Sequence, residues 1–216
     1  MKGLIRKDFC QWKNYAKQYA LMLVVFFGIG IALKSPEYTA FMTLIIGLSL
    51  TMSGFSTDEY YHWDVYACAL PVDRKKIVAA KYATILLLAV FLSAVSAIFV
   101  GISAVILKKP VWDYVPVAGI HLLLLPFISA LVYPVIYKYG IEKARMLYIL
   151  FFLIPFLAVM ALQEIMEKRE MPKLIQMILE LPNRNQILIL GAVAITLLAL
   201  TISYKISVKI YEKKEF

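Results

Sequence analysis

Charged and aromatic side chains gather in one stretch of the chain, from Asp58 to Tyr82, which reads DEYYHWDVYACALPVDRKKIVAAKY. Carboxylates, basic groups and aromatic rings in close succession can form ion pairs and ring contacts with another macromolecule. Long apolar runs stand on both sides of this stretch. From the residues alone, two interpretations stay open: a surface that another molecule binds, or a connecting loop whose aromatic rings lie at a membrane interface.

The sequence carries none of the motifs that would make this chain a catalyst. It has no G-x-x-x-x-G-K-[ST] phosphate loop, no H-E-x-x-H and no G-x-S-x-G. Charged residues are nearly missing from the interiors of the apolar runs, where catalytic or ion-coupling groups would have to lie. We therefore expect no enzyme activity and no cofactor in this chain. If ATP drives the protein, another chain must bind it.

No metal site is expected either. Cys10 and Cys68 lack a second Cys or His at the spacing that metal ligands require. Both thiols are expected to be structural.

His121 is the exception inside an apolar run. It could titrate or contact a transported molecule, because the ordinary pKa of histidine lies near neutrality. It could equally form a hydrogen bond across a helix interface, which is the interpretation that we favour. Pro116, Pro126 and Pro134 lie in the same run and invite kinks, because each removes a backbone donor.

The elements that position these residues are predicted to be membrane-spanning helices. Hydrophobic side chains make up 62% of the 216 residues and charged ones 17%, which is too apolar for a soluble domain. A bilayer core takes about 20 helical residues per crossing. An all-α integral membrane protein with a single domain, residues 1–216, and six spans is predicted. The spans are Tyr19 to Leu33, Tyr38 to Phe55, Ile77 to Leu107, Val111 to Tyr137, Ala144 to Gln163 and Gln186 to Tyr204.

Residues 1–18 are predicted to form an amphipathic helix lying on the membrane surface. The apolar side chains recur at alternating steps of four and three residues and so share one face. They are Ile5, Phe9, Trp12, Ala16 and Tyr19. The alternative is a first span that starts early. A cleaved signal peptide is disfavoured, because residues 32–36 make a poor cleavage site.

The distribution of Lys and Arg predicts that both termini are cytoplasmic. With the N-terminus inside, inner segments hold sixteen basic residues and outer segments hold seven, and cationic loops stay in the cytoplasm. The formal net charge of +9 is then mostly a topology signal. Because the basic residues are spread over four membrane-bordering segments, we expect anionic membrane lipids as partners and no nucleic acid.

The charged stretch is predicted to contain a short helix and a turn. Ser56 and Glu59 fit the capping-box pattern, so a helix should begin near Thr57. It should stop before Pro71, because the residue preceding a proline is pushed out of helical geometry.

A long helix is predicted after this turn. Asp73 can cap it, and Arg74 to Leu107 contains no proline. At about 1.5 Å per residue the helix is about 50 Å long, so its first turns should project beyond the hydrocarbon. On the outer side, residues 164–186 form a longer segment, and its Pro172 to Leu181 portion has apolar residues at helical spacing.

The stretch also resembles a known family. The pattern comprises Asp58-Glu59, Trp63-Asp64, Tyr66, Leu70-Pro71-Val72, Arg74-Lys75, Ile77-Val78 and Lys81-Tyr82. It is similar to the loop after the second span in small bacterial permease subunits of type 2 ATP-binding cassette (ABC) exporters. The six-span plan and the N-terminal amphipathic helix resemble that family over the whole chain.

The resemblance implies that the loop, residues 56–76, holds a coupling helix that docks on an ATPase subunit. The ATPase-coupling residues it implies are Asp58, Glu59, Tyr60, Trp63, Asp64, Tyr66, Leu70, Pro71, Arg74 and Lys75. It also implies a bacterial cytoplasmic membrane location, two ATPase subunits that hold ATP and Mg²⁺, a second permease subunit, identical or homologous, and short extracellular helices within 164–186.

The function expected from these observations is a permease subunit that exports a hydrophobic or amphipathic molecule, such as a peptide, lipid or drug. Two rival hypotheses remain. One is a carrier or channel that works without ATP, and the other is a membrane immunity or scaffold protein that moves nothing.

Overall fold

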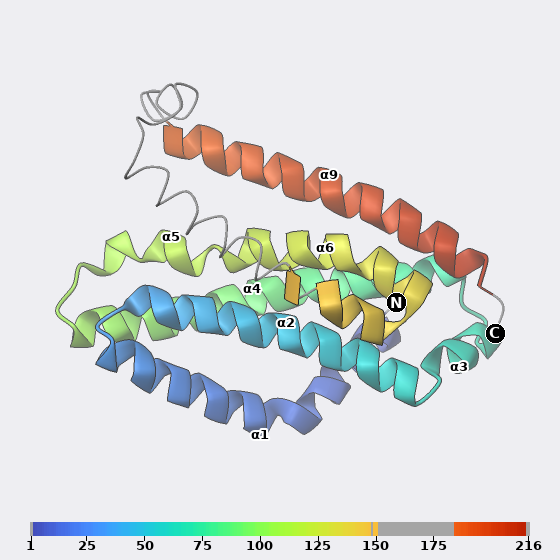
Figure 1. Ribbon diagram of the computed structural model, residues 1–216, viewed down its shortest axis with the longest axis horizontal. Coiled ribbons are helices and arrows are strands. Elements are labelled where there is room, and N and C mark those ends of the chain that lie inside the picture. The colour runs from blue at the N-terminus through green and yellow to red at the C-terminus, as the bar shows by residue number, and fades with distance from the viewer. Residues whose placement is uncertain (1, 148, 151–183, 215–216) are drawn as a thin grey trace.

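The computed structural model describes residues 2–147, 149–150 and 184–214 (Figure 1). Within these ranges the chain is helical and contains no strand. The helices are α1 (Lys2–Ala32), α2 (Pro36–Tyr60), α3 (Trp63–Ala69), α4 (Arg74–Ile106), the short 3-10 helix η1 (Val111–Asp113), α5 (Val115–Ala118), α6 (His121–Tyr139) and α9 (Arg184–Glu212). Residues 141–147 and 149–150 are also helical.

Among the described residues, five segments are long and apolar enough to cross a membrane. They are Lys2–Ala32, Pro36–Tyr60, Arg74–Ile106, Val111–Tyr139 and Gln186–Glu212. For the described residues, the predictions of an all-helical fold and of apolar helices long enough to span a bilayer are therefore confirmed. The predicted fifth span, Ala144 to Gln163, and the outer segment 164–186 lie for the most part outside the described residues.

The core of the bundle lies where α2, α4 and α6 meet. Gly47 makes this close approach possible, because a methyl group on it would lie 2.5 Å from Leu92 Cδ1 and 3.2 Å from Leu125 Cδ2. Leu88, Leu92 and Leu125 are almost fully buried there. Large apolar side chains on the outer face of α9, such as Leu190 and Leu198, are exposed, as suits a surface that faces lipid.

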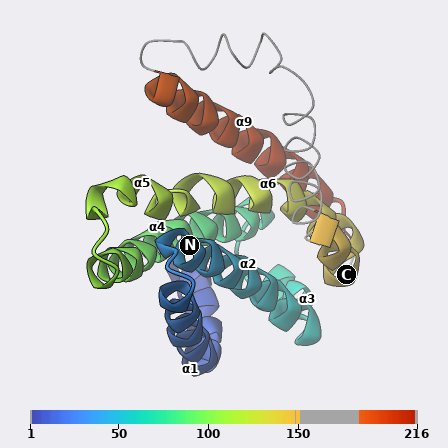
Figure 2. The ribbon, with the colours of Figure 1, turned by 60° about the vertical axis from the view of Figure 1, so that its left-hand side comes forward.

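The two outermost helices flank this core. Figure 2 shows α1 and α9 on opposite sides of the layer that α2, α4 and α6 form. α1 begins, and α9 ends, at the same end of the bundle, where α3 also lies (Figure 1). The segments predicted to be cytoplasmic thus share one end of the molecule.

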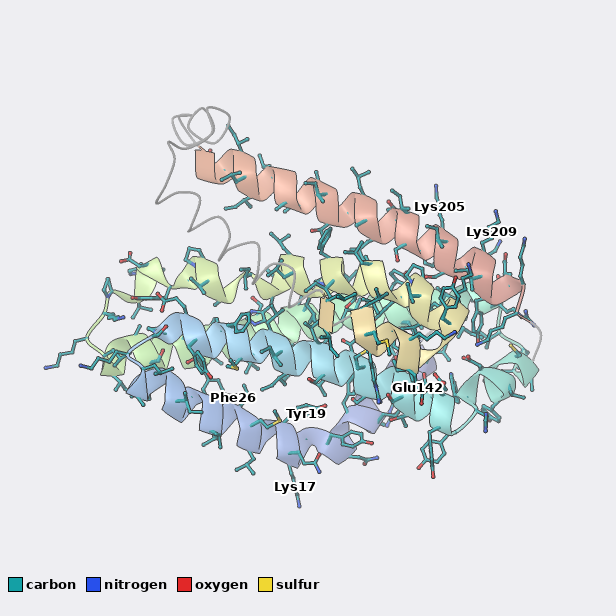
Figure 3. All side chains as sticks on the ribbon, in the orientation of Figure 1. Lys17, Tyr19, Phe26, Glu142, Lys205 and Lys209 are labelled. Atoms are coloured by element: carbon teal, nitrogen blue, oxygen red, sulfur yellow. The ribbon has the colours of Figure 1, made fainter. Side chains whose placement is uncertain are left out.

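The surface helix predicted for residues 1–18 is continuous with the first candidate span, because α1 runs without a break from Lys2 to Ala32. Its position on the membrane surface stays a prediction. Part of the predicted lipid-facing side instead packs on the protein itself. The Trp12 indole donates a hydrogen bond to the Leu50 carbonyl oxygen at 2.9 Å. Tyr19 and Phe26 lie between α1 and α2, whereas Lys17 points away (Figure 3). The structure favours the alternative, a first span that starts early.

The capping box predicted at Ser56 and Glu59 is wrong. Both residues lie inside α2, which continues to Tyr60. The physical reason is that Phe55 and Asp58 are buried by contacts with other helices, which keeps α2 regular for one more turn. The chain breaks at His62, whose φ of 50° is left-handed, and α3 begins at Trp63.

The turn and the long helix after it agree with the prediction. Leu70, before Pro71, is extended, with φ −77° and ψ 150°. Asp73 caps α4 by accepting a hydrogen bond from the Lys75 amide at 3.1 Å. α4 then spans 33 residues, or about 50 Å.

Candidate coupling surface at the end of the bundle

Residues 61–73, which include α3, connect α2 to α4, and we call them the elbow. Its two ends continue directly into α2 and α4, two of the candidate membrane spans. The ten residues predicted to couple the chain to an ATPase lie in or beside the elbow. The structure divides them into groups with different surroundings.

The first group is exposed and aromatic. Tyr60 and Tyr66 are 77% and 59% exposed. Tyr61, which the prediction did not include, is 72% exposed, and we call the three residues the tyrosine surface. The rings of Tyr60 and Tyr61 pack edge to face, with centroids 5.0 Å apart. Tyrosine supplies a large, stiff contact area with a polar tip, which is why it is enriched at protein interfaces. These side chains have the exposure that contact with another protein requires.

Asp58 belongs to a second, buried group. Its carboxylate is 7% exposed and lies 2.7 Å from the Lys81 ammonium and 2.5 Å from that of Lys7. Asp8 completes the set, 2.9 Å from Lys81 and 3.1 Å from Lys7. Gln11 donates a further hydrogen bond to Asp58 at 2.8 Å. Asp58 is thus not part of an exposed docking surface.

We call Lys7, Asp8, Asp58 and Lys81 the ion cluster. It joins α1, α2 and α4, and its two negative and two positive charges compensate each other. Buried charges are tolerated only when they are paired and hydrogen-bonded. The prediction of site residues missed Lys7, Asp8 and Lys81. The available signal was that Asp8 is the first acidic residue and the next, Glu37, follows 29 positions later.

Glu59 has an internal role as well as an exposed position. Its carboxylate accepts a hydrogen bond from the Ile141 amide at 2.9 Å, at the start of the helical segment that follows α6. Gly140 makes this connection, with a φ of 84° that favours glycine. An acidic side chain at a helix N-terminus stabilises the unpaired amides and the helix dipole.

The remaining predicted residues line the inner side of the elbow or its turn. Trp63 is partly buried, with the Lys7 ammonium 4.4 Å from its ring centroid. Asp64, Arg74 and Lys75 all contact the end of α9. Leu70 is partly buried in the turn and Pro71 is exposed. The site prediction therefore brings together three kinds of position: exposed, buried in the ion cluster, and bound to α9.

The comparison with protein families decides the class of this molecule. The family of ABC-2 family transporter proteins matches residues 3–212. The chain belongs to the ABC-2 transporter family. A search of curated proteins and one of solved structures give no match for this ABC-2 chain. Membership makes it a permease component of an ABC transporter and implies association with an ATP-binding subunit.

His121 of this ABC-2 chain is fully buried at the start of α6. Its Nδ1 lies 2.9 Å from the Ala118 carbonyl oxygen and its Nε2 lies 3.1 Å from that of Ala40. The ring thus links α5 and α6 to α2, and it fits the favoured interpretation of a hydrogen bond across a helix interface.

A groove of about 630 Å³ opens between α1, α2 and the helical segment after α6. Ile45, Leu48 and Met52 give it an apolar wall, and Ser49 and Ser53 add hydroxyl groups. No cluster of His, Cys, Asp and Glu that could hold a metal ion occurs in the part of the ABC-2 chain that the structure describes.

Proposed function

We propose that this ABC-2 chain is the permease half of an exporter whose energy comes from ATP hydrolysis on a separate subunit. The observation that carries the proposal is the tyrosine surface at the elbow. Three exposed aromatic side chains stand beside a segment that is continuous with two spans. Exposed aromatic rings at the junction of two spans favour a binding site for another protein.

The elbow gives this contact mechanical consequences. Closure of the ATPase pair on ATP would push on α3, and α4 would carry the movement across the membrane, because its 33 residues form one helix. The ion cluster fastens the same end of the bundle to α1. The spans would then tilt between inward and outward openings instead of bending at the elbow.

The proposed assembly contains two permease subunits, identical or homologous, and two ATPase subunits. ATP and Mg²⁺ belong to the ATPase subunits, and this chain holds no cofactor. The elbow end faces the cytoplasm of a bacterial cell in this arrangement, which places both termini inside. The sixteen-to-seven distribution of basic residues supports this orientation, and Lys205 and Lys209 point outward from α9 near that end (Figure 3).

The transported molecule is proposed to be hydrophobic or amphipathic. The groove between α1 and α2 supports this, because its wall combines aliphatic side chains with serine hydroxyl groups. Arg145 adds one positive charge to this wall, and the other lining residues are uncharged. Such a wall favours an amphipathic peptide, lipid or drug over an inorganic cation.

The direct test is binding of the ATPase. The permease would be co-expressed with the phosphate-loop ATPase encoded beside it and purified through a tag on the permease. Replacing Tyr60, Tyr61 and Tyr66 with serine should remove the ATPase from the purified complex and leave membrane insertion unchanged. Trp112→Ser is the matched control, because Trp112 is 84% exposed but lies in η1, at the opposite end of the bundle.

Retention of the ATPase by the triple variant would overturn the coupling role of the tyrosine surface. Transport by the permease alone in liposomes, without any ATPase, would instead support an ATP-independent carrier. Stable binding without any ATP turnover stimulated by the permease would support a scaffold protein.

A further inference from the structure

The end of α9 is capped by a side chain from another helix. The last carbonyl groups of a helix lack partners within it. Arg74, the first residue of α4, donates from Nη1 to the carbonyl oxygens of Glu212 at 2.8 Å, Lys214 at 3.0 Å and Tyr211 at 3.3 Å. A cationic group is also favourable beside the negative end of the helix dipole. Arg74 thus fixes the end of α9 to the start of α4.

The elbow holds the same end of α9 through a second residue. Asp64, on α3, accepts a hydrogen bond from the Tyr211 hydroxyl at 3.3 Å and pairs with the Lys214 ammonium at 3.4 Å. Tyr211 is fully buried, and its ring packs edge to face on Tyr137 at 5.5 Å. The contact therefore reaches from α3 into the interior of the bundle.

These two residues stand on either side of the Pro71 turn. A displacement of α3 relative to the bundle must either break the contacts of Asp64 and Arg74 or move α9 with the elbow. Breaking them would uncover polar groups that are partly or fully buried, such as the Tyr211 hydroxyl, and this is costly. A third contact, between Lys75 and Glu212 at 3.8 Å, is exposed and adds little.

We propose that Asp64 and Arg74 are positioning residues that carry movement of the elbow into α9. The inference rests on the proposed function and extends it, because α4 is then one of two helices that receive the force. Asp64 and Arg74 act through Tyr211 and the end of α9, to which both side chains are bound. With 29 residues, or about 44 Å, α9 is long enough to transmit a shift of its end across the membrane.

The experiment measures the position of α9 in the complete complex with the ATPase. Spin labels are placed on cysteines at Val24 of α1 and Leu198 of α9, which are 60% and 62% exposed. The two helices lie on opposite sides of the bundle (Figure 2). Cys10 and Cys68 are first replaced with serine. The distance between the labels is measured by pulsed electron paramagnetic resonance in nanodiscs, without nucleotide and after trapping with ATP and orthovanadate.

Trapping should shift the label distance in the parent complex. Arg74→Met should lose most of that shift while it binds the ATPase and traps nucleotide as the parent does. Lys76→Met is the matched control, since it removes an exposed lysine from the same turn of α4 and should keep the full shift. A full shift in Arg74→Met, or no shift in a parent complex that traps nucleotide, would overturn the inference.

A charge exchange separates positioning from general stability. Asp64→Lys should reduce the shift, and adding Lys214→Asp should restore more than half of what was lost, because the ion pair is rebuilt with its charges reversed. No recovery would count against the inference. Failure of the parent chain to bind any ATPase is a distinct result, which would overturn the proposed function and this inference with it.

Discussion

The ion cluster and the tyrosine surface lie only two residues apart in the sequence, at Asp58 and Tyr60, yet their surroundings are opposite. The Asp58 side chain is 7% exposed and bound to two lysines, whereas Tyr60 is 77% exposed. One turn of α2 therefore carries a residue that faces the bundle and one that faces outward. In this region, adjacency in the sequence says little about a shared role.

The difference distinguishes residues that fix the elbow to the bundle, the ion cluster, from residues that are accessible to a binding partner, the tyrosine surface. Residues of the ion cluster come from α1, α2 and α4, and each charge is compensated inside the protein. The tyrosine surface is largely exposed, so it contributes little to internal packing, and it is the contact area that we propose for the ATPase. The predictions below test this separation in order of expected effect.

The largest effect is expected from Lys81→Met. It removes the lysine that contacts both Asp8 and Asp58 and leaves two buried carboxylates with the Lys7 ammonium alone. The free energy of unfolding should fall by about 3–5 kcal/mol, because an unpaired buried charge is costly. Unfolding in detergent measures it. Lys205→Met, an exposed control on α9, should be unchanged, and equal stability of both variants would contradict the structural role of the cluster.

A smaller and different effect is expected at the tyrosine surface. Tyr66→Ala should weaken binding of the ATPase by about 1–2 kcal/mol, because aromatic anchors dominate many interfaces. Tyr66→Phe should lose less, because it keeps the ring. Binding is measured by biolayer interferometry on the purified permease. A lower free energy of unfolding without a change in affinity for the ATPase would show that Tyr66 has a structural role instead of a binding role.

Glu59→Ala should have a local effect of about 1 kcal/mol, as expected for loss of a helix cap. Its carboxylate accepts from the Ile141 amide, so hydrogen exchange at residues 141–147 should become faster. Glu59→Gln keeps an acceptor and should exchange at nearly the parent rate. Unchanged exchange in Glu59→Ala would show that the cap does not stabilise this helix.

Lys75→Met should have the smallest effect. The Lys75 and Glu212 side chains are 60% and 43% exposed and 3.8 Å apart, so losing the pair should change stability by less than about 0.5 kcal/mol. ATPase affinity decides its second role. If the affinity for the ATPase also stays unchanged, Lys75 contributes neither to stability nor to docking. A large loss of affinity would show that Lys75 belongs to the docking surface.

Local rules predicted much of the fold. The apolar runs predicted the candidate spans that the structure describes. Pro71 and Asp73 predicted the end of the turn and the start of α4. The end of α2 was missed, because it depends on partners for Phe55 and Asp58 that lie far away in the sequence. Lys7 is 51 positions from Asp58.

The candidate site was predicted less well for the same reason. A loop sequence shows which side chains are polar, but it does not show which of them another helix will bind. Asp64 and Arg74 are bound by the end of α9, about 140 positions downstream, and so differ from the exposed tyrosines beside them. The packing of α9 against the elbow distinguishes the bound residues from the exposed ones, and the sequence of the loop does not contain this information.

The cap that Arg74 places on α9 joins two segments that are synthesised at different times. Residues 211–214 leave the ribosome about 137 positions after Arg74. The start of α4 therefore lacks its contact with the end of α9 while the intervening helices are made and inserted. Until then the inner side of the elbow is unfilled. We expect the elbow to reach its final shape only in chains in which α9 has been inserted, which would make ATPase recruitment depend on α9.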